Sequence, residues 1–141
     1  MNRNARRIVL AITAALGLYV GVWAAALPQS FYDSFPGLGL MWVSIDGPFN
    51  EHLIRDVGAL YLAIAAASIY AACVRDVTAT RAVGLAWTVF GAPHLFYHLA
   101  HLEGLAPIDV IGNVVTLGGS LLLGIALLIP ERRLTESQEE S

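Results

Sequence analysis

The sequence contains no lysine, so all eight of its basic residues are arginine. Charged residues of any kind make up only 13% of the chain, about half of their usual share in a soluble domain. The one cysteine, Cys73, has no partner for a disulfide within the chain. No basic cluster with interleaved aromatic residues is present, which argues against nucleic-acid binding. Apolar residues are abundant instead: 57% of the chain is hydrophobic and the mean hydropathy is +0.65, as in a membrane protein.

Motifs of the common enzyme classes are also missing. The chain has no GxSxG nucleophile elbow, P-loop, CxxC pair, HExxH zinc motif or glycine-rich dinucleotide-binding turn. The sequence therefore leaves open whether the protein is an enzyme, and it identifies no substrate or reaction.

Four apolar segments approach or exceed the length of about 20 residues that a helix needs to cross a bilayer. Backbone groups in lipid have no water to bond, so each segment should be helical. We predict an all-α integral membrane protein, a four-helix bundle of up-down-up-down topology formed by residues 1–130. The expected helices are about 8–27, 51–74, 82–102 and 108–129. The hydrophilic residues 131–141 are predicted to form a disordered cytoplasmic tail.

The first apolar segment has a second interpretation. Arg3, Arg6 and Arg7 precede it and three alanines, 24–26, end it, a pattern that is also typical of a cleaved signal peptide. The segment is longer than the apolar part of most signal peptides, which favours a retained helix. Both alternatives stay open at this point.

The arginines predict the orientation. In the four-helix arrangement, seven of the eight fall on one side of the membrane and only Arg55 falls on the other. Positive residues favour the cytoplasmic side, so we expect both termini to be cytoplasmic and the protein to span the cell membrane several times. Its expected partner is the lipid bilayer, and a homo-oligomer or a larger membrane complex is compatible with the sequence.

The long loop at 28–50 lies on the outer side in this arrangement. It carries several aromatic residues, a type that favours the level of the lipid headgroups: Phe31, Tyr32, Phe35, Trp42 and Phe49. We expect the loop to lie over the outer mouth of the bundle, as an interfacial anchor in preference to a functional lid.

Three of the four histidines lie within the stretch PHLFYHLAHLEG. His94, His98 and His101 are spaced i, i+4, i+7, so at about 100° per residue they share one face near the outer end of the third helix, and Tyr97 borders that face. Ionisable groups inside a membrane are costly and by default indicate function.

The neighbouring helices carry polar residues at the same depth. His52 and Asp56 share a face at the outer end of the second helix, and Asp109 and Asn113 share a face at the outer end of the fourth. We therefore expect a polar pocket in the outer half of the bundle.

Imidazoles and carboxylates together suit a transition-metal ion such as zinc, copper or iron. The predicted metal ligands are His94, His98, His101, His52 and Asp56. A cofactor or ligand would also contact Tyr97, Asp109, Asn113 and Arg55. Haem between facing histidines and a quinone–proton site are weaker alternatives. A non-catalytic accessory or ligand-binding subunit, whose polar core is structural, is the hypothesis from a different class. For Arg55, a salt bridge with Glu51 four residues earlier is favoured over an anion clamp.

Two segments also carry a family resemblance. NEHLIRDVGALYLA (50–63) and RAVGLAWTVFGAPHLFYHLAHL (81–102), in a layout of four short spans, resemble small uncharacterised actinobacterial-type membrane proteins grouped loosely with the DoxX-like families. The resemblance covers about residues 8–129. Because DoxX is associated with quinone-linked redox chemistry, it implies an oxidoreductase subunit. The histidine cluster is not a general hallmark of those families, so no catalytic residue is carried over.

Overall fold

A computed structural model describes residues 1–130 of the chain, so the predicted tail lies outside the described residues. Residues 1–130 form four long helices, α1 (Arg3–Ala26), α3 (Glu51–Val74), α4 (Val77–Ala100) and α5 (Pro107–Leu128). The predicted all-α class is confirmed for this part of the chain. Three of these helices, α1, α3 and α5, are long and apolar enough to cross a membrane.

Helix boundaries follow local capping. Asp76 starts α4 earlier than predicted, because its side chain accepts a hydrogen bond of 2.8 Å from the N–H of Ala79. Asn50 caps α3 in the same way through the N–H of Leu53, at 3.1 Å. At the other end, α4 stops at Ala100, so His101 is the residue after the helix and no longer part of it.

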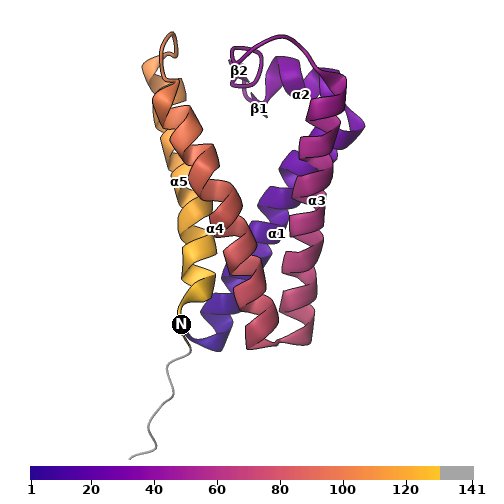
Figure 1. Cartoon of the computed structure of the whole chain (residues 1–141), viewed down its shortest axis with the longest axis vertical. Helices are drawn as coiled ribbons and strands as arrows, with labels where there is room; N and C mark the ends of the chain where they lie inside the picture. The colour runs from indigo at the N-terminus through magenta and orange to yellow at the C-terminus, as the bar shows by residue number, and fades with distance from the viewer. Residues whose placement is uncertain (131–141) are drawn as a thin grey trace, which may run out of the picture.

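The loop between α1 and α3 has structure of its own, which the sequence did not predict. It forms the short helix α2 (Pro28–Ser34) and a hairpin of two strands, β1 (Pro36–Gly37) and β2 (Leu40–Met41), paired antiparallel with Pro36 opposite Met41. Leu38 and Gly39 turn the hairpin with φ of 58° and 81°. The loop lies at the end of the molecule away from the N-terminus (Figure 1); this end is called the outer end below, and the end at the N-terminus the inner end.

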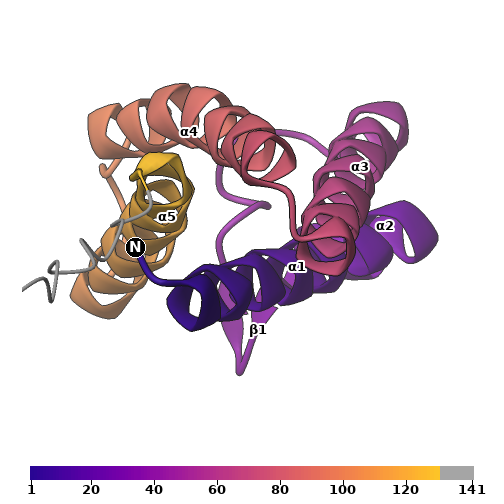
Figure 2. The same cartoon turned by 90° about the horizontal axis from the view of Figure 1, so that it is seen from below.

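The long helices form two pairs. In Figure 1, α1 lies along α3 and α4 lies along α5; the pairs meet at the inner end, near the N-terminus, and diverge towards the outer end. The view from below shows the same pairing (Figure 2). The arrangement is therefore more open than the predicted bundle.

Glycines allow the close approach within each pair. A Cβ on Gly58 of α3 would lie 2.5 Å from the backbone nitrogen of Ala25 in α1, and one on Gly84 of α4 would lie 2.8 Å from Cβ of Leu127 in α5. Small residues let helices pack closely in a bilayer, so each pair behaves as a compact unit.

The core that joins the two pairs lies towards the inner end. It contains buried residues from all four long helices: Leu10, Tyr61, Ile64, Ala71, Val83, Trp87 and Leu127. Trp87 is 1% exposed and donates a hydrogen bond of 3.2 Å from its indole Nε1 to Oγ of Ser68 on α3. A second, smaller cluster joins α1, α2 and α3; its buried residues are Ala24, Phe31 and Ile54.

Candidate functional site

Two of the predicted site residues, His94 and His98, belong to a line of rings along α4. The Phe90 ring packs edge-on against Tyr61 of α3, with centroids 5.1 Å apart. Next along the helix, His94 packs against Phe90 at 5.2 Å, and His98 stacks on His94 at 5.0 Å with an angle of 20° between the ring planes. Both imidazoles are half-buried. The prediction that they share one face is correct.

His101 does not join this line. Because the helix ends at Ala100, His101 has φ −128° and ψ 50°, and its ring leaves the stripe that continued helical spacing would give. Its ring instead stacks on Tyr97 at 4.2 Å, and its Nδ1 lies 2.7 Å from the Tyr97 carbonyl oxygen. The prediction that all three imidazoles share one helix face is therefore wrong for His101, because the helix ends before it, although His101 stays within electrostatic range of His98.

His52 and Asp56 lie away from the histidine line. His52 Nε2 is 3.2 Å from the Asp56 carboxylate, and their side chains are 89% and 63% exposed. They stand on the outer end of α3, which diverges from the outer end of α4 in both views (Figures 1 and 2). The expectation that they share a pocket with the histidines is not met, because the helix pairs diverge at this depth.

Arg55 has local partners. Its Nε donates a hydrogen bond of 2.8 Å to Glu51, and a terminal nitrogen donates a short hydrogen bond to the carbonyl of Ala25. The favoured interpretation, a salt bridge with Glu51, is confirmed. The second bond satisfies a carbonyl at the end of α1, where no helical partner exists. Arg55 thus joins the outer ends of α1 and α3.

The polar side chains of α5 have hydrogen-bond partners within the chain. Asp109 accepts a hydrogen bond of 2.9 Å from the indole Nε1 of Trp42, a residue of the outer loop. Asn113 is 3% exposed, and its side chain donates to the backbone carbonyl of Asp109 at 3.0 Å. Thr116 and Ser120 also donate to carbonyls of their own helix, at 2.8 Å each. Asp109 is thus paired with the indole, and the other three side chains bond to carbonyls of their own helix, which lowers the cost of placing them in apolar surroundings.

The structure adds two residues that the sequence did not single out as site residues. Trp42 reaches α5, as described above, and Asp46 of the same loop is close enough to His98 for an electrostatic interaction between the carboxylate and the imidazole. Asp46 lies in the loop that the sequence predicts only as an interfacial anchor. Its distance in sequence from His98 left no local pattern that could relate the two.

The predicted metal site is not assembled as a whole. Within residues 1–130, no group of three or more His, Cys, Asp or Glu side chains is close enough together to hold a metal ion. What remains of the predicted set is the stacked pair of His94 and His98, and both His101 and Asp46 lie within electrostatic range of His98.

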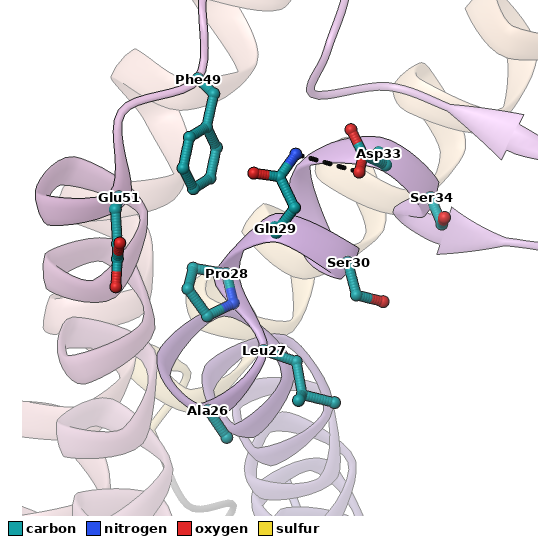
Figure 3. Close-up of a pocket in the computed structure, with 9 residues that line it drawn as sticks. All are labelled: Ala26, Leu27, Pro28, Gln29, Ser30, Asp33, Ser34, Phe49 and Glu51. Atoms are coloured by element: carbon teal, nitrogen blue, oxygen red, sulfur yellow. Dashed lines mark hydrogen bonds between the residues drawn. The ribbon is translucent and has the colours of Figure 1, made fainter.

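An open pocket lies elsewhere, at the corner between α1, α2 and the start of α3. Its volume is about 710 Å³. Figure 3 shows its lining, which includes the side chains of Asp33, Glu51 and Phe49. Both carboxylates have partners: Gln29 donates to Asp33 at 3.0 Å (Figure 3), and Glu51 accepts from Arg55. None of the predicted site residues lines this pocket.

Comparison with known proteins identifies a family but no activity. No curated protein and no solved structure matches the chain. A family model described as a domain of unknown function, DUF4345, matches residues 5–100. The match includes α1, the outer loop, α3 and α4 with His94 and His98, and it ends before α5; it lends no support to the DoxX-like grouping. Because the match covers more than half of the chain, the protein belongs to the DUF4345 family.

Proposed function

We propose that the protein crosses the cell membrane four times, with both ends on the cytoplasmic side. The amine of Met1 donates a hydrogen bond of 2.8 Å to the carbonyl of Pro130, so α1 begins where α5 ends. A chain whose first and last helices meet in this way crosses an even number of times. Since α1, α3 and α5 supply three crossings, α4 would supply the fourth. Its 24 residues correspond to about 36 Å, enough for the hydrocarbon core.

The arginines support this orientation. Those of the described chain other than Arg55 lie at the inner ends of α1, α3 and α4, and Arg132 and Arg133 follow α5 outside the described residues. Basic residues favour the cytoplasmic side. An impermeant thiol reagent on intact cells should label Leu38→Cys and not Thr78→Cys, both in a Cys73→Ser background. Labelling of Thr78→Cys but not of Leu38→Cys would show that the orientation is the opposite of the proposed one.

The packing of α1 supports a retained first helix. Gly17 and Gly21 of α1 lie against α3, where an added Cβ would come within 2.9 Å of Ala65 and Leu62. Leu10 belongs to the core that joins the two helix pairs. Removal of α1 as a signal peptide would therefore remove one wall of the core and leave α3 without its closest neighbour.

For the activity, we propose that the outer part of α4 binds a transition-metal ion such as zinc, copper or iron. The observation that carries the proposal is the stacked pair of His94 and His98 in the outer half, with the carboxylate of Asp46 in electrostatic range. Two imidazoles and one carboxylate form a ligand set for such ions, and for iron or copper the centre would be redox-active. The ligands are not gathered in the described structure, so binding requires the rings to turn and the loop to bring Asp46 closer.

Haem is a weaker candidate than a small ion. A haem held between two histidines would need them on facing helices. His94 and His98 lie on the same helix, and His52, the histidine of α3, is exposed and paired with Asp56. A quinone stays compatible with the stacked rings.

Metal analysis of the purified full-length protein tests the proposal. The protein is loaded with Zn²⁺, Cu²⁺ or Fe²⁺, freed of excess ion and analysed for bound metal, with an absorption spectrum to detect haem. We expect stoichiometric metal that is lost in His98→Ala and kept in His52→Ala, the matched control. Absence of metal from the parent, or equal metal in parent and His98→Ala, would overturn the metal site.

A non-catalytic accessory subunit is the second candidate, and the polar contacts of α5 favour it. Asp109 accepts from Trp42 of the outer loop, and Asn113, Thr116 and Ser120 donate to carbonyls of their own helix, so each of these side chains makes a structural contact within the chain. This candidate predicts that the purified protein carries no metal and that substitutions which break the polar contacts only lower its stability. Gly118 and Gly119, which have no atom within 4 Å of an added Cβ, would be open to a second copy or a partner helix.

A further inference from the structure

Contact between the two helix pairs is concentrated in the inner part of the molecule. The outermost ring contact between α3 and α4 is that of Tyr61 with Phe90, at 5.1 Å. Ten residues of α4 follow Phe90, which is about 15 Å of helix. Over this length the two pairs diverge (Figure 1).

One side chain of the outer loop reaches across to the other pair. Trp42 is 8% exposed, and its indole nitrogen donates to Asp109 of α5 at 2.9 Å. Its six-membered ring lies directly on Gly112, where an added Cβ would be only 2.5 Å from Cζ2. Within residues 1–130, this is the side-chain hydrogen bond that joins the loop to α5.

The other end of Trp42 is held by the first pair. Its backbone N–H donates to the carbonyl of Phe35 at 2.8 Å, and the two rings pack edge-on at 6.3 Å. Phe35 in turn packs against Trp23 of α1 at 5.9 Å and against Phe31 of α2 at 4.5 Å. A continuous series of aromatic contacts therefore runs from α1 through the loop to α5.

We propose that Trp42 is a latch that holds the outer ends of the two helix pairs together, and that its release lets the pairs swing apart about the core at Trp87. The close glycine contacts hold each pair together as a unit, and the fully buried Trp87, Leu10 and Leu127 provide a pivot at the inner end. Closed, the latch holds the loop that carries Asp46 close to His98. Open, it uncovers the face of α4 that bears the histidines. The latch stands on its own contacts and does not require the proposed metal.

Substitutions that act on opposite sides of this contact can open it. Gly112→Ala places a methyl group where the indole lies and leaves every hydrogen-bonding group in place. Trp42→Phe keeps an aromatic ring and removes the donor to Asp109. Gly119→Ala is the matched control on the same helix, because an added Cβ there meets no atom within 4 Å.

Spin-label distances test the latch in the full-length protein in lipid nanodiscs. Labels on Leu53 of α3 and Leu99 of α4, both exposed, with Cys73→Ser, report the separation of the outer ends. A swing of about 10° about Trp87 moves Leu99, about 18 Å further along α4, by about 3 Å, so Gly112→Ala should lengthen and broaden the distance distribution by about that amount, Trp42→Phe by less, and Gly119→Ala not at all. An unchanged distribution in Gly112→Ala would overturn the proposal.

A second label pair tests whether each variant has kept its fold. Labels on Val22 of α1 and Leu53 of α3, both exposed, measure a distance within one pair, which should stay constant in every latch variant. If the distance within the pair also changes in Gly112→Ala, the test rests on the milder variant Trp42→Phe. In that variant, a longer distance between the pairs with an unchanged distance within the pair supports the latch. An unchanged distance between the pairs overturns it. Because this measurement uses metal-free protein, its outcome is independent of the metal analysis.

Discussion

The contacts within the helix pairs differ in kind from the contacts between them. Within a pair, backbones approach so closely that a single methyl group on Gly58 or Gly124 would come within 2.5 Å or 2.9 Å of the partner helix. Between the pairs, side chains meet: Trp87 with Ser68 and Tyr61 with Phe90. Small-residue contacts leave little freedom to repack, whereas side-chain contacts can change rotamer. The molecule thus combines rigid halves with an adjustable junction.

The largest effect should come from removing the centre of that junction. Trp87→Ala deletes a side chain that is 1% exposed and should lower the free energy of unfolding by about 3 to 5 kcal/mol, because the surrounding helices cannot collapse fully into the space. Equilibrium unfolding in mixed SDS micelles, followed by circular dichroism, measures the loss. Trp87→Phe is the control and should retain more than half of the stability. Equal values for the two variants would contradict the central role of the indole.

An intermediate effect should come from within a pair. Gly58→Ala forces a methyl group against the backbone of α1 and should cost about 1 to 3 kcal/mol, although alanine is the better helix former. Gly118→Ala, with no neighbouring atom within 4 Å, should be neutral or slightly stabilising in the same unfolding assay. The comparison of rigid and adjustable contacts fails if the two alanine variants behave alike.

The smallest effect should come from the exposed ion pair at the outer end. Glu51→Gln removes the negative partner of Arg55, and both side chains are about half exposed, so the loss should be about 0.5 kcal/mol and should shrink in high salt. Arg55→Ala should cost more, because it also removes the donor to the Ala25 carbonyl. A larger loss in Glu51→Gln than in Arg55→Ala would show that the ion pair, and not the helix cap, joins the outer ends.

Local signals predicted the helices better than they predicted the site. The span of α3 is predicted from its apolar run at 57–74 and from the polar first turns that follow the cap Asn50. The predicted start of α4, residue 82, lies after the observed start at Val77, because the capping role of Asp76 is visible only when the preceding loop is known to be short. The predicted helix at 82–102 includes His101, although α4 ends at Ala100. Each of these errors concerns a helix terminus, where one residue decides whether a side chain stays on a stripe.

The remaining features depend on contacts between distant parts of the chain. Trp42 and Asp109 are 67 positions apart, and nothing in the spacing of either residue relates them. The divergence of the pairs, which separates His52 from His98, likewise depends on how side chains at Tyr61 and Trp87 pack. Periodicity indicates which residues share a face of one helix, and it cannot indicate how far that face stands from another helix.

The pairing of helices also bears on how the chain is assembled in the membrane. Each pair joins two long helices that follow one another in the sequence, so the α1–α3 hairpin can form while the ribosome is still making α4, and α4–α5 can follow as a second unit. The contacts of the first pair with α5, among them those of Trp42 with Asp109 and Gly112 and of Met1 with Pro130, have to wait until the last helix has entered the bilayer. Biogenesis would then end at the outer loop, and a chain that stalls before α5 would retain a complete first half with its aromatic loop still unattached.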